Sequence, residues 1–177
     1  MAQLILTAMG PDKPGLVGEL TGHLHAAGAN IADSRMVNLR GQFAIILLLE
    51  GSAEAVAALR HQLPVLGHKM GLSVTLPPDG GPTAPAVLRG AGLPFKLKTY
   101  SLDQPGLVHK ITDVLRAHGV NIEELSARQE SAAFAGSTLF LMEMRLTVPA
   151  DVAVRSLRSE LEKQAATLNC DLDLEPA

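Results

Sequence analysis

An internal repeat constrains the fold of this chain more than any other feature. The segment Asp12–Val17 reads Asp-Lys-Pro-Gly-Leu-Val, and Asp103–Val108 reads Asp-Gln-Pro-Gly-Leu-Val. A second pair, Gly28-Ala29-Asn30-Ile31 and Gly119-Val120-Asn121-Ile122, keeps the same offset of 91 residues. Two separate matches in one register are not expected by chance in a chain of 177 residues. We therefore predict a tandem duplication, with each copy built around a turn between a strand and a helix.

The length of the chain suits two small domains of roughly 80–90 residues each. We predict a first domain over 1–77, a linker over 78–92 and a second domain over 93–177. The linker is predicted from composition, because Pro77–Pro85 holds four prolines and two glycines. Hydrophobic residues make up 47% of the chain but aromatic residues only 3%. Each core must therefore be built mainly from Leu, Val, Ile and Ala.

The first copy divides into six segments with alternating strand and helix patterns. The apolar runs 4–9 and 43–49 are continuous, which is typical of strands covered on both faces. Gly41-Gln42 is expected to form the turn before the second of these runs. Pro64 should break or kink a helix near Leu63, because proline lacks an N–H and clashes with the preceding turn. The segments in chain order are a strand over 4–9, a helix from Pro14 to Gly28, strands over 30–40 and 43–49, a helix around 56–66 and a strand over 72–76.

The second copy repeats this order, with a longer hairpin after Asn121. The four additional residues lie around 131–134 and predict a contact flap. The predicted segments are a strand over 93–99, a helix over 107–119, a strand from Asn121, a strand over 138–146, a helix over 154–168 and a strand over 170–174. The order β-α-β-β-α-β is that of the ferredoxin-like fold. We therefore predict an α+β protein with two four-stranded antiparallel sheets, each with two helices on one face.

The charge and the composition argue against nucleic acid and membranes as partners. The net charge is −3, from 15 basic and 18 acidic residues that are spread along the chain. A domain that binds nucleic acid usually carries a basic patch, and base stacking requires aromatic side chains, which are scarce here. We therefore expect no direct contact with nucleic acid. No apolar run approaches the ~20 residues that span a bilayer, and Met1–Met9 lacks the basic start of a signal peptide. The expectation is a cytoplasmic protein without membrane association.

No pattern in the sequence predicts catalysis. There is no Gly-x-Ser-x-Gly elbow, no phosphate-binding loop and no Gly-x-Gly-x-x-Gly. His23 and His25 are two residues apart and would point to different sides of a helix, so no metal-ligand spacing results. Cys170 is the only cysteine and is expected to be a small, partly buried thiol near a strand. We expect neither enzymatic activity, nor a metal, nor a cofactor.

The paired motifs resemble those of ACT domains, which are small-molecule sensing modules, most often for amino acids. Each copy has Asp-x-Pro-Gly-Leu-Val after its first strand and Gly-x-Asn-Ile before its second. The resemblance covers nearly the whole chain apart from the linker. Two ACT repeats with nothing else attached most resemble the glycine cleavage system transcriptional repressor group. In ACT domains the loop of one unit typically meets the Asn of a neighbouring unit, which implies a homo-oligomer with ligand sites at interfaces.

The chemistry of these residues suits an amino acid. A helix start offers unpaired N–H groups and the positive end of the helix dipole to a carboxylate. An Asp carboxylate can accept hydrogen bonds from an ammonium group, and an Asn side chain can both donate and accept hydrogen bonds. Some amino-acid-binding ACT units carry His and Asn ahead of the Pro-Gly pair, where this chain has Gly10 and Asp12, then Ser101 and Asp103. The resemblance implies ligand-binding roles for Asp12, Pro14, Gly15, Leu16, Val17 and Asn30, and for Asp103, Pro105, Gly106, Leu107, Val108 and Asn121.

Structural roles for the same residues are open alternatives. Asp12 and Asp103 can cap the following helices. The motif glycines can serve helix–sheet packing alone, and the two asparagines follow helix-ending glycines and can belong to a turn. The motifs and these alternatives together leave three hypotheses for the function. The leading hypothesis is a non-enzymatic regulator that senses a small amino acid such as glycine or serine and acts through a protein partner in the transcriptional control of amino-acid metabolism. The alternatives are a regulatory subunit of a separate amino-acid-metabolic enzyme and an assembly module without a ligand.

Overall fold

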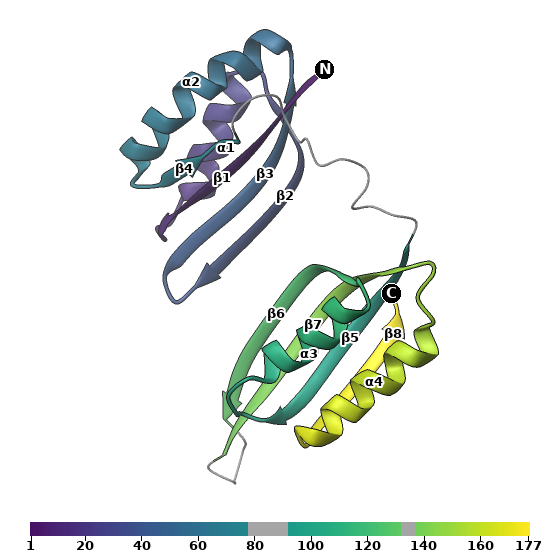
Figure 1. Cartoon of the computed structure of the whole chain (residues 1–177). Coiled ribbons are helices and arrows are strands. Elements are labelled where there is room, and N and C mark those ends of the chain that lie inside the picture. The colour runs from purple at the N-terminus through teal and green to yellow at the C-terminus, as the bar shows by residue number, and fades with distance from the viewer. Residues whose placement is uncertain (78–91, 132–136) are drawn as a thin grey trace. The chain divides into compact units, whose positions relative to one another are not determined.

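The computed structural model divides the chain into two compact units, Met1–Ala84 and Pro85–Ala177. It describes residues 1–77, 92–131 and 137–177 (Figure 1). All but the last residue of the predicted linker, and most of the predicted flap around 131–134, lie outside these described residues. Each unit has its own cluster of buried apolar side chains, so each has a separate core.

The first unit folds as β-α-β-β-α-β, as predicted. Its strands form one antiparallel sheet in the order β2-β3-β1-β4. Leu20 and Leu24 of the first helix and Leu59 and Leu63 of the second pack into the core against the sheet. The elements are β1 (Ala2–Pro11), α1 (Leu16–Ala26), β2 (Asn30–Leu39), β3 (Gln42–Gly51), α2 (Ala53–Met70) and β4 (Ser73–Thr75).

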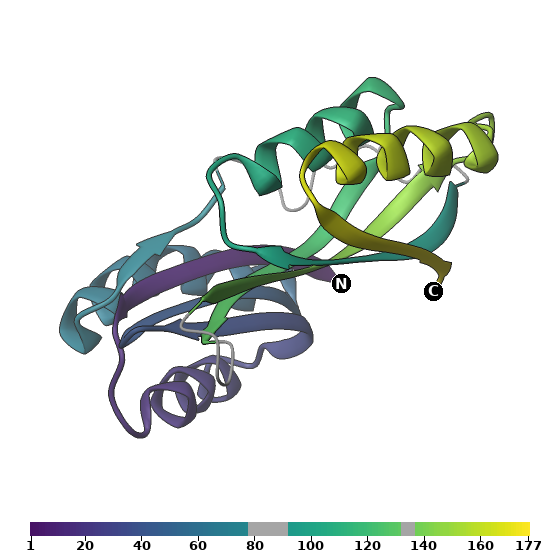
Figure 2. The ribbon, with the colours of Figure 1, turned by 90° about the horizontal axis from the view of Figure 1, so that it is seen from below.

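The second unit repeats this topology with the strand order β6-β7-β5-β8. Both helices lie on one face of its sheet (Figure 2). Even a detail of strand pairing is duplicated, because the register shifts between Ile31 and Asp33 in β2 and between Ile122 and Glu124 in β6. The elements are β5 (Gly92–Leu102), α3 (Leu107–Ala117), β6 (Asn121–Ser131), β7 (Thr138–Pro149), α4 (Val154–Thr167) and β8 (Cys170–Pro176). The predicted α+β fold is confirmed.

The central strands are buried on one face, not on two as their apolar runs predicted. Along β3, Phe43, Ile45 and Leu47 are buried, whereas Ile46 between them is 52% exposed. Met9 of β1 is 54% exposed on the same outer face. Since both helices cover the inner face, alternate side chains on each strand point away from the core. The continuous apolar runs predicted burial of both faces, but only the face towards the helices is buried.

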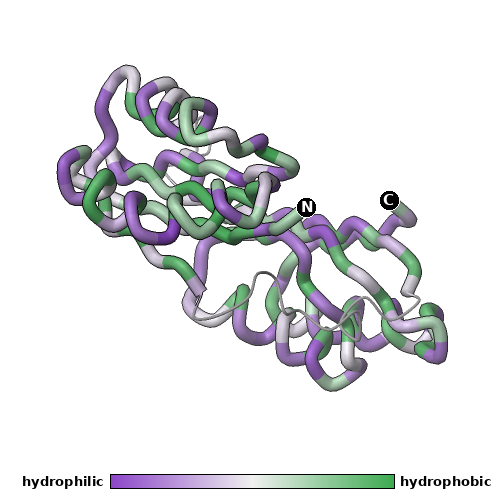
Figure 3. Tube along the Cα trace, turned by 90° about the horizontal axis from the view of Figure 1, so that it is seen from above, coloured by the Kyte–Doolittle hydropathy of each residue, from purple (hydrophilic) through white to green (hydrophobic). Residues whose placement is uncertain are grey.

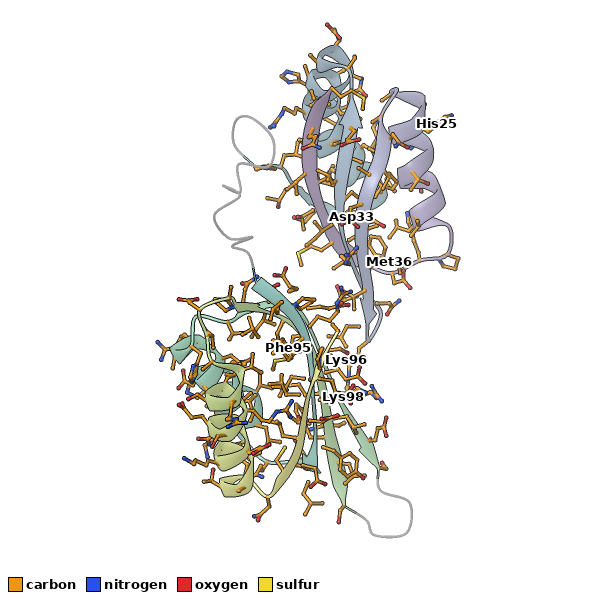
Figure 4. The ribbon with its side chains drawn as sticks, turned by 90° about the vertical axis from the view of Figure 1, so that its right-hand side faces the viewer. His25, Asp33, Met36, Phe95, Lys96 and Lys98 are labelled. Atoms are coloured by element: carbon orange, nitrogen blue, oxygen red, sulfur yellow. The ribbon has the colours of Figure 1, made fainter. Side chains whose placement is uncertain are left out.

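The outer faces of both sheets carry apolar and charged side chains. In the first unit this face carries apolar side chains, including Met9, Val37 and Ile46, all at least half exposed. In the second unit, Phe95 of β5 points towards the core, and Lys96 and Lys98 alternate with it towards the other face (Figure 4). The Lys96 ammonium lies 3.3 Å from a carboxylate oxygen of Glu143 on β7. Tyr100 and Leu102 of β5 are 45% and 59% exposed on this face, and the first unit has an ion pair of its own there, between Arg35 and Asp33 of β2.

Two sequence predictions are wrong, one at the first hairpin and one in the helix that contains Pro64. Arg40 and Gly41 have positive φ angles of 50° and 78°, so they form the two-residue turn, and Gln42 already belongs to β3. Helix α2 continues from Ala53 to Met70 without a break at Pro64. Leu59, Leu63 and Met70 are buried on both sides of the proline, and this packing holds the helix together.

Replacing Pro64 with alanine should stabilise the first unit. The proline is exposed and cannot donate to the carbonyl of the preceding turn. Proline is about 3 kcal/mol less favourable than alanine inside a helix. The unfolded alanine variant has more conformational entropy than the unfolded wild type, which offsets about 1 kcal/mol of this gain. We expect urea denaturation to show a gain of about 1–2 kcal/mol. Val65→Ala, at the exposed neighbouring position, is the control and should change stability by less than about 1 kcal/mol. A loss of stability in Pro64→Ala would show that the proline is required for the helix.

Candidate functional site

The two motif loops have the same backbone conformation. Gly15 and Gly106 precede α1 and α3 with φ angles of 86° and 89°, in the left-handed region that favours glycine. Their carbonyls accept the first helical hydrogen bonds, from the N–H groups of Glu19 and Lys110, both at 2.9 Å. A Cβ at Gly15 would meet nothing within 4 Å, and at Gly106 only the Lys110 Cε at 3.8 Å. The alternative that these glycines serve helix–sheet packing is therefore wrong, since the backbone angle requires them.

The residues after these glycines are divided between the core and the surface. The side chains of Leu16 and Leu107 are buried, so these residues can offer a ligand only their backbone. Val17 is 39% exposed and Val108 is half-buried. The N–H groups at the start of each helix face the loop, as they do in any helix. Each loop therefore offers backbone N–H donors, and the buried leucine side chain holds the start of the helix against the core.

Asp12 and Asp103 join the loop to a distant strand instead of capping a helix. The amide nitrogen of Asn38, in β2, donates to Oδ2 of Asp12. In the second unit Nε2 of Gln129, in β6, donates to Oδ2 of Asp103 at 2.7 Å. Neither α1 nor α3 has a side-chain hydrogen bond at its N-terminal cap. The helix-cap alternative is therefore wrong.

Sequence inspection missed these Asp–amide contacts, although a signal for them exists. Asn38 and Gln129 are 91 residues apart, in the register of the duplication, and both carry a side-chain amide. The backbone strengthens the same junction, because the N–H of Asp12 donates to the Gly41 carbonyl and that of Asp103 to the Thr138 carbonyl, both at 2.9 Å. Each loop is thus fixed to the hairpin end of its own sheet.

Asn30 and Asn121 are strand residues rather than turn residues. Each is the first residue of its strand, β2 or β6, and both are exposed. The left-handed positions of the preceding turns are Gly28 and Gly119, with φ angles of 78° and 65°. The turn alternative for the asparagines is therefore wrong.

Within one unit the structure does not bring the motif loop and the asparagine together. Asn30 pairs with Glu50, whereas Pro11, next to the loop, pairs with Gln42 at the other end of β3. Eight residues of strand separate these rows, which is roughly 27 Å at ~3.4 Å per residue. The second unit repeats the arrangement, because Asn121 pairs with Thr147 while Leu102 pairs with Leu139. No small molecule can touch both motifs of the same repeat.

A groove lies beside Asn121 in the second unit. It has a volume of about 980 Å³ and is bordered by α3, by the start of β6 and by the segment after β7. Nδ2 of Asn121 donates to Oε1 of Glu123 at 2.7 Å, and the Thr147 hydroxyl donates to the same oxygen at 2.8 Å. The asparagine side chain is thereby held at the edge of the groove.

Cys170 has the character of a structural thiol and not of an activated nucleophile. The thiol is buried at the start of β8, as expected from the sequence, and its burial raises the pKa of the thiol. A thiol with a raised pKa is mostly protonated at neutral pH and is a poor nucleophile. Among residues 1–77, 92–131 and 137–177 no three His, Cys, Asp or Glu side chains gather as metal ligands would.

None of the helices in the described part of the chain is long and apolar enough to cross a bilayer. Hydrophobic and hydrophilic residues alternate over short stretches along the trace of both units (Figure 3).

Comparison with known proteins assigns the family. The model of the ACT domain family matches residues 2–76, which is the first repeat, and residues 102–175, which is the second repeat from the end of β5 onwards. The chain therefore belongs to the ACT domain family, as the motifs indicated.

The chain is similar to three further proteins, two along most of its length and one over a single repeat. It is 27% identical over 166 residues to the glycine cleavage system transcriptional repressor of Escherichia coli (strain K12), covering 94% of this chain and 85% of the repressor. The crystal structure of an unknown protein from Galdieria sulphuraria matches with a TM-score of 0.79 at 27% identity, covering 99% of this chain and 98% of that one. The UPF0237 protein of Methanopyrus kandleri is 33% identical over 76 residues, 42% of this chain but 84% of that protein. This last relative corresponds to a single repeat.

Proposed function

We propose that this chain is a non-enzymatic regulatory protein that senses a small amino acid and acts through a protein partner. The observation that carries the proposal is the duplicated loop, in which a left-handed glycine and an Asp–amide contact fix a helix start in both repeats. Such a loop offers N–H donors to a carboxylate and an Asp to an ammonium group. The 27% identity to a glycine cleavage repressor favours a role in the transcriptional control of amino-acid metabolism. The nucleic acid itself would then be contacted by the partner.

The ligand sites proposed from the motifs are shared between repeats. Loop and asparagine lie at opposite ends of each sheet, so one ligand can contact both only if the loop comes from one repeat and the asparagine from another. The proposed loop residues are Asp12, Pro14, Gly15, Leu16 and Val17, with Asp103, Pro105, Gly106, Leu107 and Val108 in the second repeat. The proposed partners of these loops are Asn30 and Asn121.

We further propose that the chain forms a homo-oligomer. The outer sheet face of the first unit exposes Met9, Val37 and Ile46, and Leu39 at the end of β2 is 69% exposed. Exposed apolar side chains grouped on one face are typical of an interaction surface. This face also supports the alternative of an assembly module without a ligand, and ligand binding distinguishes the two.

Thermal unfolding in the presence of each of the twenty amino acids tests the proposed function. A ligand that binds only the folded chain stabilises it by about 2.7 kcal/mol at a hundredfold excess over Kd. We expect glycine, serine or another small amino acid to raise the unfolding temperature, and the Asn30→Ala and Asn121→Ala variants to lose this response without a change in oligomeric state. If none of the twenty stabilises the wild-type chain, it is not an amino-acid sensor.

Capture of the bound partner from the source cell separates the two regulatory alternatives. A transcription factor or DNA-bound complex would support transcriptional control. A catalytic chain of amino-acid metabolism would identify the protein as the regulatory subunit of a separate enzyme.

A further inference from the structure

One edge of the first sheet is only partly filled. Strand β1 pairs with β3 along its whole length, Ala2–Pro11, but with β4 only over Thr7–Met9. In the second unit the corresponding strand β5 pairs with β8 over the longer segment Phe95–Ser101 (Figure 1). Among the described residues, nothing therefore pairs with Ala2–Leu6 on the side of β4.

The second unit shows which backbone groups face this edge. The carbonyl of Pro94 in β5 accepts a hydrogen bond from the N–H of Ala177, just beyond β8, at 3.0 Å. Pro94 corresponds to Gln3 at the offset of 91 residues, and the backbone groups of a strand point to the same side at every second residue. The N–H and C=O groups of Gln3 and Ile5 therefore point to the partly filled edge. Leu4 between them has no exposed surface, which agrees with backbone groups that point to β3.

The sequence after β4 explains why the described part of the chain does not fill the edge itself. By its register, Pro77 is at the position that Glu175 has in β8, because Thr75 and Asp173 pair with corresponding residues of β1 and β5. Proline has no N–H to donate to a neighbouring strand. The carbonyl of Pro77 accepts a hydrogen bond from Nη1 of Arg60 in α2 at 3.0 Å. The pairing with β1 therefore ends at Thr75, and the chain is fixed to the helix instead.

This edge lacks the features that protect the edges of natural sheets from further strands. Protected edges carry charged side chains, prolines or a bulge. The outer strand β8 has an acidic residue at every second position, and β2 has a register shift and the Arg35–Asp33 ion pair. The segment Ala2–Leu6, in contrast, reads Ala-Gln-Leu-Ile-Leu, carries no charge and pairs with β3 without a register shift. An edge of this kind is a template for another strand.

The side chains beside the edge define the chemistry of the strand that fits. In the second unit Lys96 pairs with Glu175, so the basic residue of β5 has an acidic neighbour on β8. Ile5 holds the position of Lys96 in β1, and it is half-buried beside Leu48 of β3. Cross-strand pairs stabilise a sheet when their side chains are alike in polarity or opposite in charge. A strand with a neutral, β-branched or apolar residue opposite Ile5 therefore fits better than an acidic one.

We infer that the edge formed by Ala2–Leu6 docks an extended, neutral segment of a protein partner as an added strand. Backbone hydrogen bonds with Gln3 and Ile5 bind the segment, and the Ile5 side chain selects against acidic neighbours. This inference rests on the proposed function, in which the chain acts through a protein partner, and deepens it because it assigns the docking surface. Neither the motif loops nor the two asparagines take part.

Amide hydrogen exchange of the free, full chain tests whether the edge is open. Thr7 is the internal reference, because its amide faces the same side of β1 but lies beside β4. After correction for the intrinsic rate of each residue, the Ile5 amide should exchange about tenfold faster than the Thr7 amide, or more. Equal protection of the two amides would show that the chain already covers this edge and would overturn the inference.

Two matched peptides with blocked ends are the probes for binding. The neutral one is Thr-Val-Thr-Val-Thr, and the acidic one has aspartate in place of each threonine. We expect the neutral peptide to slow exchange at Gln3 and Ile5 with a Kd of about 1 mM or tighter, and the acidic peptide to bind more weakly. A fully N-methylated neutral peptide has no backbone donors and should bind about tenfold more weakly or worse.

A lysine at position 5 should reverse the preference between the two peptides. Ile5→Lys gives the first repeat the residue type that the second has at position 96, so it should weaken the neutral peptide and strengthen the acidic one, each about threefold. Thr7→Lys is the matched control, because it places the same charge on the same strand and face where β4 already fills the edge. This variant should keep the wild-type preference for the neutral peptide.

Three results would overturn strand addition by a partner segment. The first is exchange at Gln3 and Ile5 that neither peptide slows. The second is binding that survives full N-methylation, or a preference that Ile5→Lys leaves unchanged. The third is a wild-type dimer that Ile5→Lys dissociates, which would show that a second copy of the chain fills the edge. The unfolding experiment with the twenty amino acids decides amino-acid sensing independently, so the docking edge and the proposed function can fail separately.

Discussion

Replacing Leu97 with alanine should lower the free energy of unfolding of the second unit by about 2–5 kcal/mol, the usual cost of deleting a buried leucine side chain. Leu97 lies in the central strand β5 and is fully buried in the core of the second unit. That core contains no residue of the first unit among those described. The first unit should therefore keep its stability, because the cavity removes contacts from one core only.

Leu6→Ala is the matched variant in the first unit. Leu6 lies 91 residues before Leu97, occupies the corresponding position in β1 and is also fully buried. Tyr100 is the only tyrosine of the chain and lies in β5, so its fluorescence during urea denaturation reports on the second unit. Amide hydrogen exchange of β1 and β5 measures the two units separately. Equal destabilisation of both units by either variant would show that the chain unfolds as one block.

A valine at Gly106 should destabilise the second unit by about 1–3 kcal/mol, the cost of holding a branched side chain in the left-handed region. The φ angle is 89°, and the nearest atom to an added Cβ is 3.8 Å away, so the backbone angle and not a clash sets the cost. Gly106→Asn should cost less, since asparagine enters this region more easily.

Denaturation of the two Gly106 variants separates backbone strain from crowding. Strain predicts that valine is clearly worse than asparagine, although the two side chains are similar in size. Equal losses for valine and asparagine would contradict the strain account and show that the loop has no room for any side chain.

The sequence predicted the fold well because the repeat gave each element twice. Turn residues such as Gly28 and Gly119 marked the same boundary in both copies, and the structure places the turns there. Errors arose where tertiary packing overrode a local signal. Pro64 remains inside α2 because buried leucines flank it, and the run 43–49 is apolar on both faces although only one is covered. The length of an apolar run does not reveal which face the helices take.

The candidate site was less predictable than the fold. The motifs identified the loops and the asparagines, but their positions at opposite ends of each sheet follow from strand register, which the sequence does not state. The contacts of Asp12 and Asp103 with Asn38 and Gln129 span 26 residues and depend on how the hairpin meets the loop. The sequence did not predict the groove beside α3, because His109, Asp113 and Arg116 come to one side of the chain only when the helix forms.

Calorimetric titration of the full chain with the most stabilising amino acid tests the central claim, that this ACT protein binds a small amino acid through its loops and asparagines. We predict saturable binding to the wild-type chain and its loss in a folded Asn30→Ala/Asn121→Ala double variant. Absence of saturable binding, or unchanged binding in the double variant, would contradict the claim.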